Sequence, residues 1–373
     1  MRENYTEIEE LFALRQLLSQ SETIRHCAFQ AVNFENCGFP IENYRFEDCL
    51  FMGCHIPPRM YYAMDGECIV FPRVKMPYKV FPNKLYDAKS LYLHYKPGYH
   101  ETFYTCYDTI CYERYMAHGK ETSDIKETLC RVLHDHSIGN ALDQFVKQYD
   151  EKDIVAVMGG HAVKRTDESY CQIVEISKRL TELGKLMVSG GGPGAMEAVH
   201  LGAWMAGRTE AEVRDALNIV SVSPTFRDPG WLTHAFEVME KYPCDPQFHS
   251  LGIPTWFYGH EPSTPFATDI AKFFFNSVRE DTLLSIAKGG VIYSPGSAGT
   301  FQEIFQDAAQ NHYETFGYAS PMVFLGVDYY TREVPLYPLL EDLLARGKYK
   351  GLILSITDDK EEAIDNILAF SSR

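Results

Sequence analysis

The sequence lacks the hallmarks of several common protein classes. No apolar run reaches about 18 residues, the length that a membrane-spanning helix needs, so we expect no such helix in these 373 residues. The first 20 residues are acidic and lack the apolar segment and small-residue cleavage site of a signal peptide, which predicts a cytoplasmic protein. The ten cysteines include no C-x-x-C pair, so neither a zinc ribbon nor a thioredoxin-type site is expected.

Positive charge is also scarce. Lysine and arginine number 35 against 51 aspartates and glutamates, which leaves a formal net charge of −16. Proteins that coat nucleic acid or an anionic membrane need a basic surface, so neither partner is expected. A small anionic ligand remains compatible with this charge, because helix N-termini, backbone N–H groups or a few arginines can hold it. The length predicts two or three domains.

Apolar residues recur every five positions between residues 22 and 56, with one slip of two residues. The recurring residues are Ile24, Phe29, Phe34, Phe39, Phe46, Phe51 and Ile56. Two positions before several of them stands a small or apolar residue, namely Cys27, Val32, Cys37, Cys49 and Cys54. This pattern resembles the pentapeptide repeat, whose family fold is a square right-handed β-helix with both positions inward. The alternative is a set of irregular strands with a chance aromatic rhythm. In either case the cysteines are expected to fill a core.

The rest of the N-terminal region carries weaker signals. Residues 1–20 predict one amphipathic helix. Its apolar face would comprise Ile8, Leu11, Phe12, Leu14, Leu17 and Leu18. Residues 57–118 are rich in tyrosine and proline and alternate in places like short strands, which predicts a half-buried β layer, with helices over 124–149. We therefore expect an accessory region at 1–120 and a helical linker at 121–150. One hypothesis makes the accessory region a partner-binding module that regulates or oligomerises the remaining chain.

Beyond residue 153, predicted strands and helices alternate. This alternation predicts an α/β fold, a Rossmann-like, doubly wound parallel sheet with helices on both faces. Residues 218–226 are expected to form the third strand, and residues 264–290 one long or two short helices. Ligands of such sheets bind at the carboxyl ends of the strands. Both glycine-rich loops of this sequence fall at those ends.

The first glycine-rich loop, SGGGPGAME, spans residues 189–197 and follows the second predicted strand. Glycines let the backbone approach an anion closely, and the following helix start offers free N–H groups. The loop formally satisfies the dinucleotide pattern G-x-G-x-x-A. However, that pattern belongs after the first strand, with an acid at the end of the next one, and 221–223 contains none. NAD and FAD are therefore disfavoured, and no G-x-x-x-x-G-K-[ST] motif indicates a P-loop.

The second glycine-rich loop, SPGSAGTFQE, spans residues 294–303 directly after a predicted strand. One interpretation is purely structural, because Thr300 and Glu303 have the spacing of a helix capping box. That interpretation leaves the two preceding glycines unexplained. A phosphate cradle accounts for the glycines, the threonine hydroxyl and the helix start together.

Together the two loops resemble the Lonely Guy (LOG) family and the related bacterial nucleotide 5′-monophosphate nucleosidases, formerly labelled lysine decarboxylase-like. The family signatures are GGGxxGxM and PGGxGTxxE, with an arginine on the preceding helix. The resemblance covers roughly residues 150–330, and we expect residues 151–373 to form the nucleotide-binding catalytic domain. It implies hydrolysis of the N-glycosidic bond of nucleoside 5′-monophosphates such as AMP, giving free base and ribose 5-phosphate. It also implies a homodimer or larger assembly, without a metal or cofactor.

The resemblance assigns Glu303 as the catalytic carboxylate and Arg279 as the motif arginine. The resemblance implies that Gly296, Ser297, Gly299 and Thr300 hold the 5′-phosphate. The positions at the strand ends add further nucleotide-binding candidates, namely Gly191, Gly192, Gly194 and Met196 of the first loop, and Gly159 and His161 after the first strand. For His161 the alternative is a loop histidine without a binding role. A carboxylate beside the ribose stabilises an oxocarbenium-like transition state and orients or deprotonates water. One departure is Ser297, where the family has glycine. Serine still offers its N–H there unless the backbone needs a positive φ.

Several weaker candidates and a second function accompany this hypothesis. Glu197 falls in the first helical turn after the loop, where it would touch the nucleoside, and Arg227 is a candidate phosphate contact. Asp307 lies one helical turn after Glu303, either as a second acid or on a solvated helix face. The alternative function is a non-catalytic nucleotide or molybdenum-cofactor carrier, since carriers of that cofactor share a similar fold.

Overall fold

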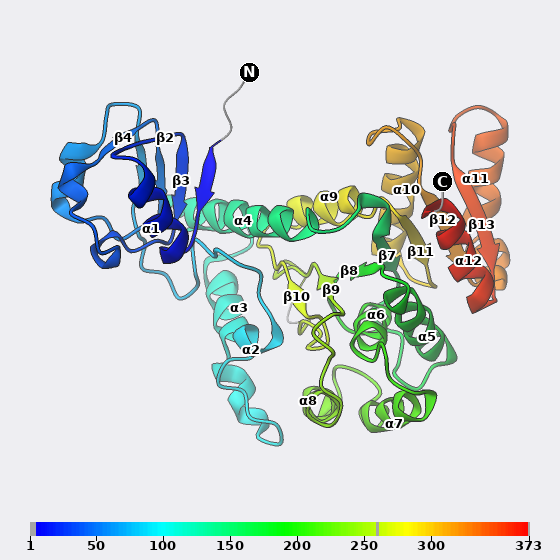
Figure 1. Cartoon of the computed structure of the whole chain (residues 1–373). Helices are drawn as coiled ribbons and strands as arrows, with labels where there is room; N and C mark the ends of the chain where they lie inside the picture. The colour runs from blue at the N-terminus through cyan, green and yellow to red at the C-terminus, as the bar shows by residue number, and fades with distance from the viewer. Residues whose placement is uncertain (1–4, 259–260, 372–373) are drawn as a thin grey trace. The chain divides into compact units, whose positions relative to one another are not determined.

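The computed structural model describes residues 5–258 and 261–371 (Figure 1). The chain forms two compact units. One comprises residues 1–85 and 121–141, and the other comprises residues 86–120 and 142–373. The division falls within the long helix α4 (Ile125–Val146), which lies where helices are predicted. No helix in the described ranges is long and apolar enough to cross a membrane.

The five-residue repeat folds as a parallel β-coil in the first unit. Its strands are β1 (Thr6–Ile8), β2 (Thr23–Arg25), β3 (Cys27–Gln30), β4 (Arg45–Glu47), β5 (Leu50–Met52) and β6 (Ile69–Phe71), joined by the short turns η1 (Phe34–Asn36), η2 (Ile41–Asn43) and η3 (Pro58–Ala63). One sheet has the order β1-β3-β5-β6, and β2 pairs with β4. Ala28 pairs with Leu50 and Thr23 with Arg45, 22 positions later. One coil therefore holds four pentads plus the two-residue slip.

The interior of this coil contains both sets of repeat positions. The rings of Phe29 and Phe51 stack with their centroids 5.1 Å apart. All five predicted small or apolar positions are buried, and the cysteines among them are free thiols. The prediction that these cysteines fill a core is confirmed. Phe39 and Ile56 are only half-buried, because they lie near turns.

Two N-terminal predictions are wrong. Residues 1–4 lie outside the described residues, and the single helix expected over 1–20 is instead β1 followed by α1 (Leu11–Gln20). Ile8 pairs with Phe29 in the sheet. In α1 the residues Leu14 and Leu18 are buried, whereas Phe12 is 75% exposed.

The β layer expected over residues 57–118 is also wrong, since β6 is its one extended strand within the described ranges. The segment instead contains α2 (Ala88–Leu91), η4 (His100–Thr105) and α3 (Tyr107–His118). In α3 the buried residues Asp108, Cys111 and Tyr115 recur at helical spacing.

A parallel seven-stranded sheet forms the centre of the second unit. Its strands are β7 (Ile154–Met158), β8 (Leu186–Ser189), β9 (Ser250–Gly252), β10 (Asp269–Ile270), β11 (Gly290–Tyr293), β12 (Pro321–Leu325) and β13 (Ile353–Thr357). They pair in the order β10-β9-β8-β7-β11-β12-β13. This confirms the predicted Rossmann-like α/β fold. The strand order reverses between β7 and β11, which is the switch point where such sheets bind ligands.

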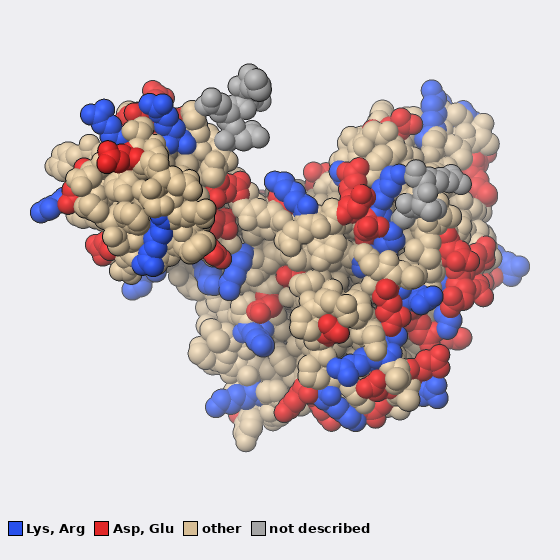
Figure 2. Space-filling model, in the orientation of Figure 1, with Lys and Arg blue, Asp and Glu red and all other residues tan. Residues whose placement is uncertain are grey.

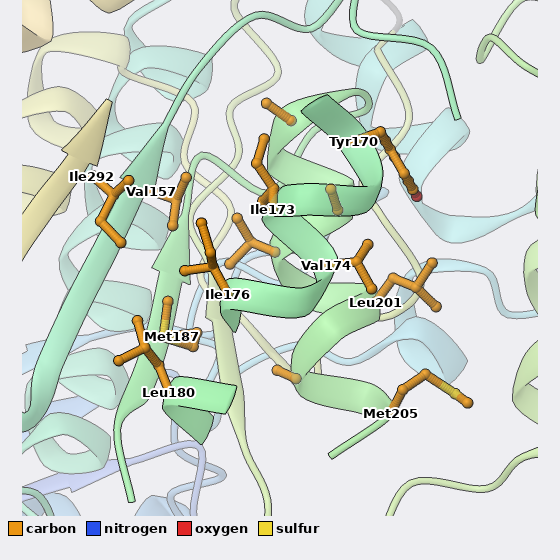
Figure 3. Packing of buried hydrophobic residues seen from close by; sticks show 14 of the residues in the cluster. Val157, Tyr170, Ile173, Val174, Ile176, Leu180, Met187, Leu201, Met205 and Ile292 are labelled. Atoms are coloured by element: carbon orange, nitrogen blue, oxygen red, sulfur yellow. The ribbon is translucent and has the colours of Figure 1, made fainter. Parts of the chain in front are cut away.

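Helices cover both faces of the sheet. On one face Val157 and Ile292 meet Ile173 and Ile176 of α5 (Glu168–Glu182), which lies beside α6 (Ala195–Trp204), as Figure 3 shows. The helix α12 (Lys360–Ser371) extends the same core. On the other face the ring of Tyr293 packs on Phe324, with centroids 5.1 Å apart. That face meets α10 (Ala298–His312), the π-helical turn η6 (Tyr329–Glu333) and α11 (Leu336–Ala345).

The third strand was expected in the wrong place. Residues 218–226 contain the end of α7 (Glu210–Val220) and the turn that leads to α8 (Trp231–Lys241), and β9 is the third strand. The helix α7 starts with a capping box in which Thr209 and Glu212 bond each other's backbone N–H groups. In 264–290 only α9 (Asn276–Ile286) is helical, because its first half contains β10 and a buried extended segment.

Candidate functional site

Two strand ends meet at the switch point. β7 runs into Gly159 and Gly160, and β11 runs into Ser294 and Pro295. The N–H of Gly160 donates to the carbonyl of Pro295 at 3.1 Å. A Cβ on Gly159 would overlap the Ser294 hydroxyl. Gly159 is thus required by the close approach of the two loops.

The first glycine-rich loop packs against the same place. Gly194 has φ +73°, and a Cβ there would lie 2.6 Å from the carbonyl oxygen of Gly160. The next N–H, that of Ala195, donates to this carbonyl at 3.1 Å. Gly191 has φ +68° and contacts Pro254 and Gly252. A left-handed backbone and tight packing explain both glycines, which are buried.

The second glycine-rich loop leads directly into α10. Ser297, Ala298 and Gly299 are exposed at the helix N-terminus, where first-turn N–H groups have no partner within the helix. These groups and the helix dipole favour an anion. Ser297 has φ −136°, an extended conformation that any residue adopts. The serine at the family's glycine position therefore causes no backbone strain.

The capping-box interpretation of this loop is wrong. The helix begins at Ala298, before Thr300, and no side chain caps it. Thr300 is buried, with its hydroxyl against Gly296, where a Cβ would overlap it. The threonine side chain therefore packs inside the loop, and Ser297, Ala298 and Gly299 are the exposed residues of the helix start.

Two tyrosines support the loop from η6. The hydroxyl of Tyr329 donates to the carbonyl of Gly296, and that of Tyr330 donates to the carbonyl of Ser294 at 2.7 Å. Sequence reasoning missed both residues. The only signal was a pair of tyrosines at the end of a predicted strand.

Glu303 and Arg279 come together beneath the loops. Glu303 lies on α10 and is 8% exposed, and Arg279 lies on α9. The distance from Arg279 Nη1 to Glu303 Oε1 is 3.9 Å. The guanidinium is fixed by Nε, which donates to the carbonyl of Ile253 at 2.8 Å, and by Nη1, which donates to Glu280 at 2.7 Å. The arginine is thus held in place by contacts that leave it beside Glu303.

The first loop adjoins this pair. A Cβ on Gly190 would overlap Arg279 Nη2 and would lie 2.6 Å from the sulfur of Met196. A Cβ on Gly192 would lie 2.8 Å from the terminal methyl of Met196. The structure therefore brings Arg279 and Met196 together over the glycines of this loop.

Burial raises the pKa of Glu303 from its ordinary 4.5 to about 7. The charge of Arg279 opposes this shift, and the carboxylate of Glu280 adds to it. At neutral pH the carboxyl group therefore exists in both protonation states, which is the range in which a general base works best.

This pKa predicts how stability depends on pH. A carboxyl group whose pKa is higher in the folded state than in the unfolded state stabilises the folded protein at low pH. This contribution is fully present below pH 4.5 and is lost as the pH rises through about 7. We expect the difference in urea midpoint between the wild type and Glu303→Gln to change in favour of the variant between pH 5 and pH 8. A difference that does not vary with pH would contradict the raised pKa.

Three predicted residues lie away from this cluster. His161 and Arg227 are exposed and line a separate cavity of about 160 Å³ beside Gly194 and Trp231. Glu197 also lines this cavity, although the residue is fully buried. Its carboxylate is buried against Arg165, at 2.9 and 2.5 Å, and accepts a hydrogen bond from Tyr170 at 3.0 Å. The carboxylate of Glu197 is therefore engaged in a buried ion pair, and its contact with a nucleoside stays a prediction.

The solvated position expected as one alternative for Asp307 is wrong. It is buried, so it does not lie on a solvated face. It accepts hydrogen bonds from Tyr293 at 2.6 Å and Asn311 at 3.2 Å on the sheet side of α10. Burial raises its pKa to about 7.

Sequence reasoning also missed three residues beside Arg279. Glu280 is buried next to it on α9, and Asn276 lies one turn earlier. The amide nitrogen of Asn276 donates to the hydroxyl oxygen of Tyr258 at 2.9 Å. An acid directly after the motif arginine was the one signal available for Glu280.

No protein-family model and no curated protein matches the chain. Solved structures that are similar to part of it include the following three. The molybdenum cofactor binding protein of the phototrophic bacterium Rippkaea orientalis is 15% identical over 58% of this chain and 96% of its own, with a TM-score of 0.36. The molybdenum cofactor carrier protein of Chlamydomonas reinhardtii is 15% identical over 59% and 98%, with a TM-score of 0.37. The structural-genomics target TM1055 is 19% identical over 58% and 98%, with a TM-score of 0.38.

The surface charge is mixed. On the face shown in Figure 2, the lysines and arginines of the described residues are scattered among acidic side chains and form no continuous basic surface.

Proposed function

We propose that residues 151–373 hydrolyse the N-glycosidic bond of nucleoside 5′-monophosphates to free base and ribose 5-phosphate. The observation that carries this proposal is the buried pair of Arg279 on α9 and Glu303 on α10, in which Glu303 lies one helical turn after Gly299 at the exposed helix start. This arrangement lies at the switch point of the sheet. It agrees with the chemistry that the resemblance to the LOG family implies.

The geometry suggests how the residues share the reaction. The N–H groups of Ser297, Ala298 and Gly299 hold the 5′-phosphate at the helix start. Glu303 follows Gly299 by four residues on the same helix, about 6 Å along its axis, so it reaches toward the ribose of a ligand anchored at the helix start. As the base departs, the ionised carboxylate stabilises positive charge on the sugar. It then takes a proton from the attacking water, whose oxygen bonds the sugar carbon, and this proton passes to the departing base, which leaves as the neutral free base.

The test is direct. Purified protein is incubated with AMP, GMP, CMP, UMP and IMP, and free base and ribose 5-phosphate are quantified together. We expect both products in equal amounts from at least one nucleotide. Nucleotide binding without any release of base would contradict hydrolysis and favour the carrier alternative.

The role of the loop is tested by Ser297→Asp. Aspartate is a good helix N-cap, so we expect the thermal stability to stay unchanged or rise. Its charge would repel a phosphate at the same helix start, and we expect at least tenfold weaker binding of ribose 5-phosphate, or about 1.4 kcal/mol. Ser297→Gly is the matched control, with binding within threefold of wild type because the N–H is kept. Equal binding by the aspartate variant and wild type would place the phosphate elsewhere.

A further inference from the structure

Two buried oxygen atoms on α9 lack a hydrogen-bond donor within the described part of the chain. They are Oε2 of Glu280, a residue that is 5% exposed, and Oδ1 of Asn276. Buried polar atoms are nearly always paired, and an unpaired one costs about 1–3 kcal/mol. Two such atoms one helical turn apart therefore indicate that something else supplies the donors.

The surroundings fix which atoms are unpaired. Glu280 Oε1 already accepts from Arg279 Nη1 at 2.7 Å, so Oε2 is the free oxygen. The amide nitrogen of Asn276 faces two oxygens, the Tyr258 hydroxyl at 2.9 Å and Glu280 Oε1 at 3.4 Å. Turning the amide over would set its oxygen against the carboxylate, so Oδ1 is the atom without a partner.

These oxygens lie beside the proposed reacting centre. Glu280 Oε1 is 2.7 Å and Glu303 Oε1 is 3.9 Å from the same nitrogen, Arg279 Nη1. A ligand that reaches Glu303 is therefore also within reach of Glu280.

The chemistry of the two oxygens restricts the ligand. Both are acceptors, and one belongs to a carboxylate, so a phosphate or another anion is repelled. The matching group carries neighbouring O–H donors. In a ribonucleotide that group is the 2′,3′-diol, which adjoins the carbon attacked in the proposed reaction.

We propose that Glu280, assisted by Asn276, binds the ribose hydroxyls and makes the site selective for ribose over deoxyribose. This inference rests on the proposed function, because it takes the ligand to be a ribose 5-phosphate ester. A deoxy ligand leaves the carboxylate oxygen unpaired, and a hydrogen bond to a charged group accounts for about 10- to 100-fold in affinity.

The experiment measures binding of ribose 5-phosphate and 2-deoxyribose 5-phosphate by calorimetry, with wild type, Glu280→Gln and Asn276→Ala. Neither ligand has a glycosidic base, so no turnover interferes. We expect wild type to prefer ribose 5-phosphate 10- to 100-fold and Glu280→Gln to prefer it less than threefold. The preference of Asn276→Ala for ribose 5-phosphate is expected to lie between these two values. This variant provides the test if Glu280→Gln does not fold. The control is Asp281→Asn, which removes the same charge from the exposed neighbouring position on α9 and should keep the wild-type ratio.

The outcomes separate this inference from the proposed hydrolysis. Sugar selectivity that disappears in Glu280→Gln supports the subsite even if no nucleotide is cleaved. Cleavage of nucleotides together with an unchanged ratio in both variants would overturn the subsite and leave the hydrolase. A wild type that binds both sugar phosphates equally, or neither, would also overturn it.

Discussion

Replacing Glu303 with glutamine is expected to lower the rate of base release about 10³-fold while nucleotide binding stays within a few-fold of wild type. Glutamine keeps the shape of the side chain but neither stabilises a cationic sugar nor takes a proton from water. Its effect should therefore appear in kcat and leave the Kd of ribose 5-phosphate nearly unchanged. Single-turnover release of base and calorimetric binding measure the two quantities separately.

The fold should tolerate this change. Glu303 is buried with a pKa raised to about 7, so its ionised form is the unfavourable one in the folded protein. A neutral glutamine removes that penalty above neutral pH. Loss of activity in this variant would therefore not reflect unfolding, which circular dichroism and the urea midpoint can verify.

Asp307→Asn supplies a matched control on the same helix. Asp307 lies one turn further along α10, is equally buried and has its pKa raised to about 7. Its carboxylate bonds Tyr293 and Asn311 and has no part in the proposed reaction. We expect this variant to keep turnover within tenfold of wild type. Turnover by Glu303→Gln at the wild-type rate would remove Glu303 from the mechanism.

The sheet and the two loops could be predicted because their signals are local. Strand residues such as Val155 to Val157 form a continuous apolar run, and each glycine-rich loop follows such a run directly. The burial of the repeat phenylalanines could be predicted for the same reason, because their spacing of five residues can be recognised in a short stretch of sequence.

What could not be predicted depends on distant contacts. β1 has three residues and exists because it pairs with β3, some 21 positions later. Residues 218–223 alternate like a strand, yet they contain the end of α7 and the turn after it. The carbonyls of Val220 and Ser223 accept hydrogen bonds from Arg165, 55 and 58 positions earlier. The burial of Glu280 and the exposure of Asp281 depend on which side of α9 packs inward. No local pattern distinguishes these neighbouring acids.

Arg165→Met is expected to be the most destabilising single substitution considered, at about 3–5 kcal/mol. Arg165 is 2% exposed and makes two hydrogen bonds to Glu197, and its Nη1 donates to the carbonyls of Val220 and Trp231, both at 3.1 Å. Methionine fills the space but leaves a buried carboxylate without its cation. It also removes one hydrogen bond from each of the carbonyls of Val220 and Trp231.

A double variant separates these contributions. If the uncompensated charge of Glu197 dominates, Arg165→Met combined with Glu197→Leu should recover much of the lost free energy of unfolding, measured by urea denaturation. The control is Arg346→Met, which breaks the exposed pair with Asp342 and should cost no more than about 0.5 kcal/mol.

The contacts of Arg165 and Tyr170 with Glu197 predict a structural role for that carboxylate. Because Arg165 and Tyr170 occupy its carboxylate, Glu197→Gln should lower stability and leave the Kd of nucleotides unchanged in the fraction that remains folded. A Glu197→Gln variant with wild-type stability and altered nucleotide affinity would contradict this structural role. Glu197 would then contact the nucleoside, as its position after the glycine-rich loop first suggested, and the ion pair with Arg165 would not be what fixes this part of the site.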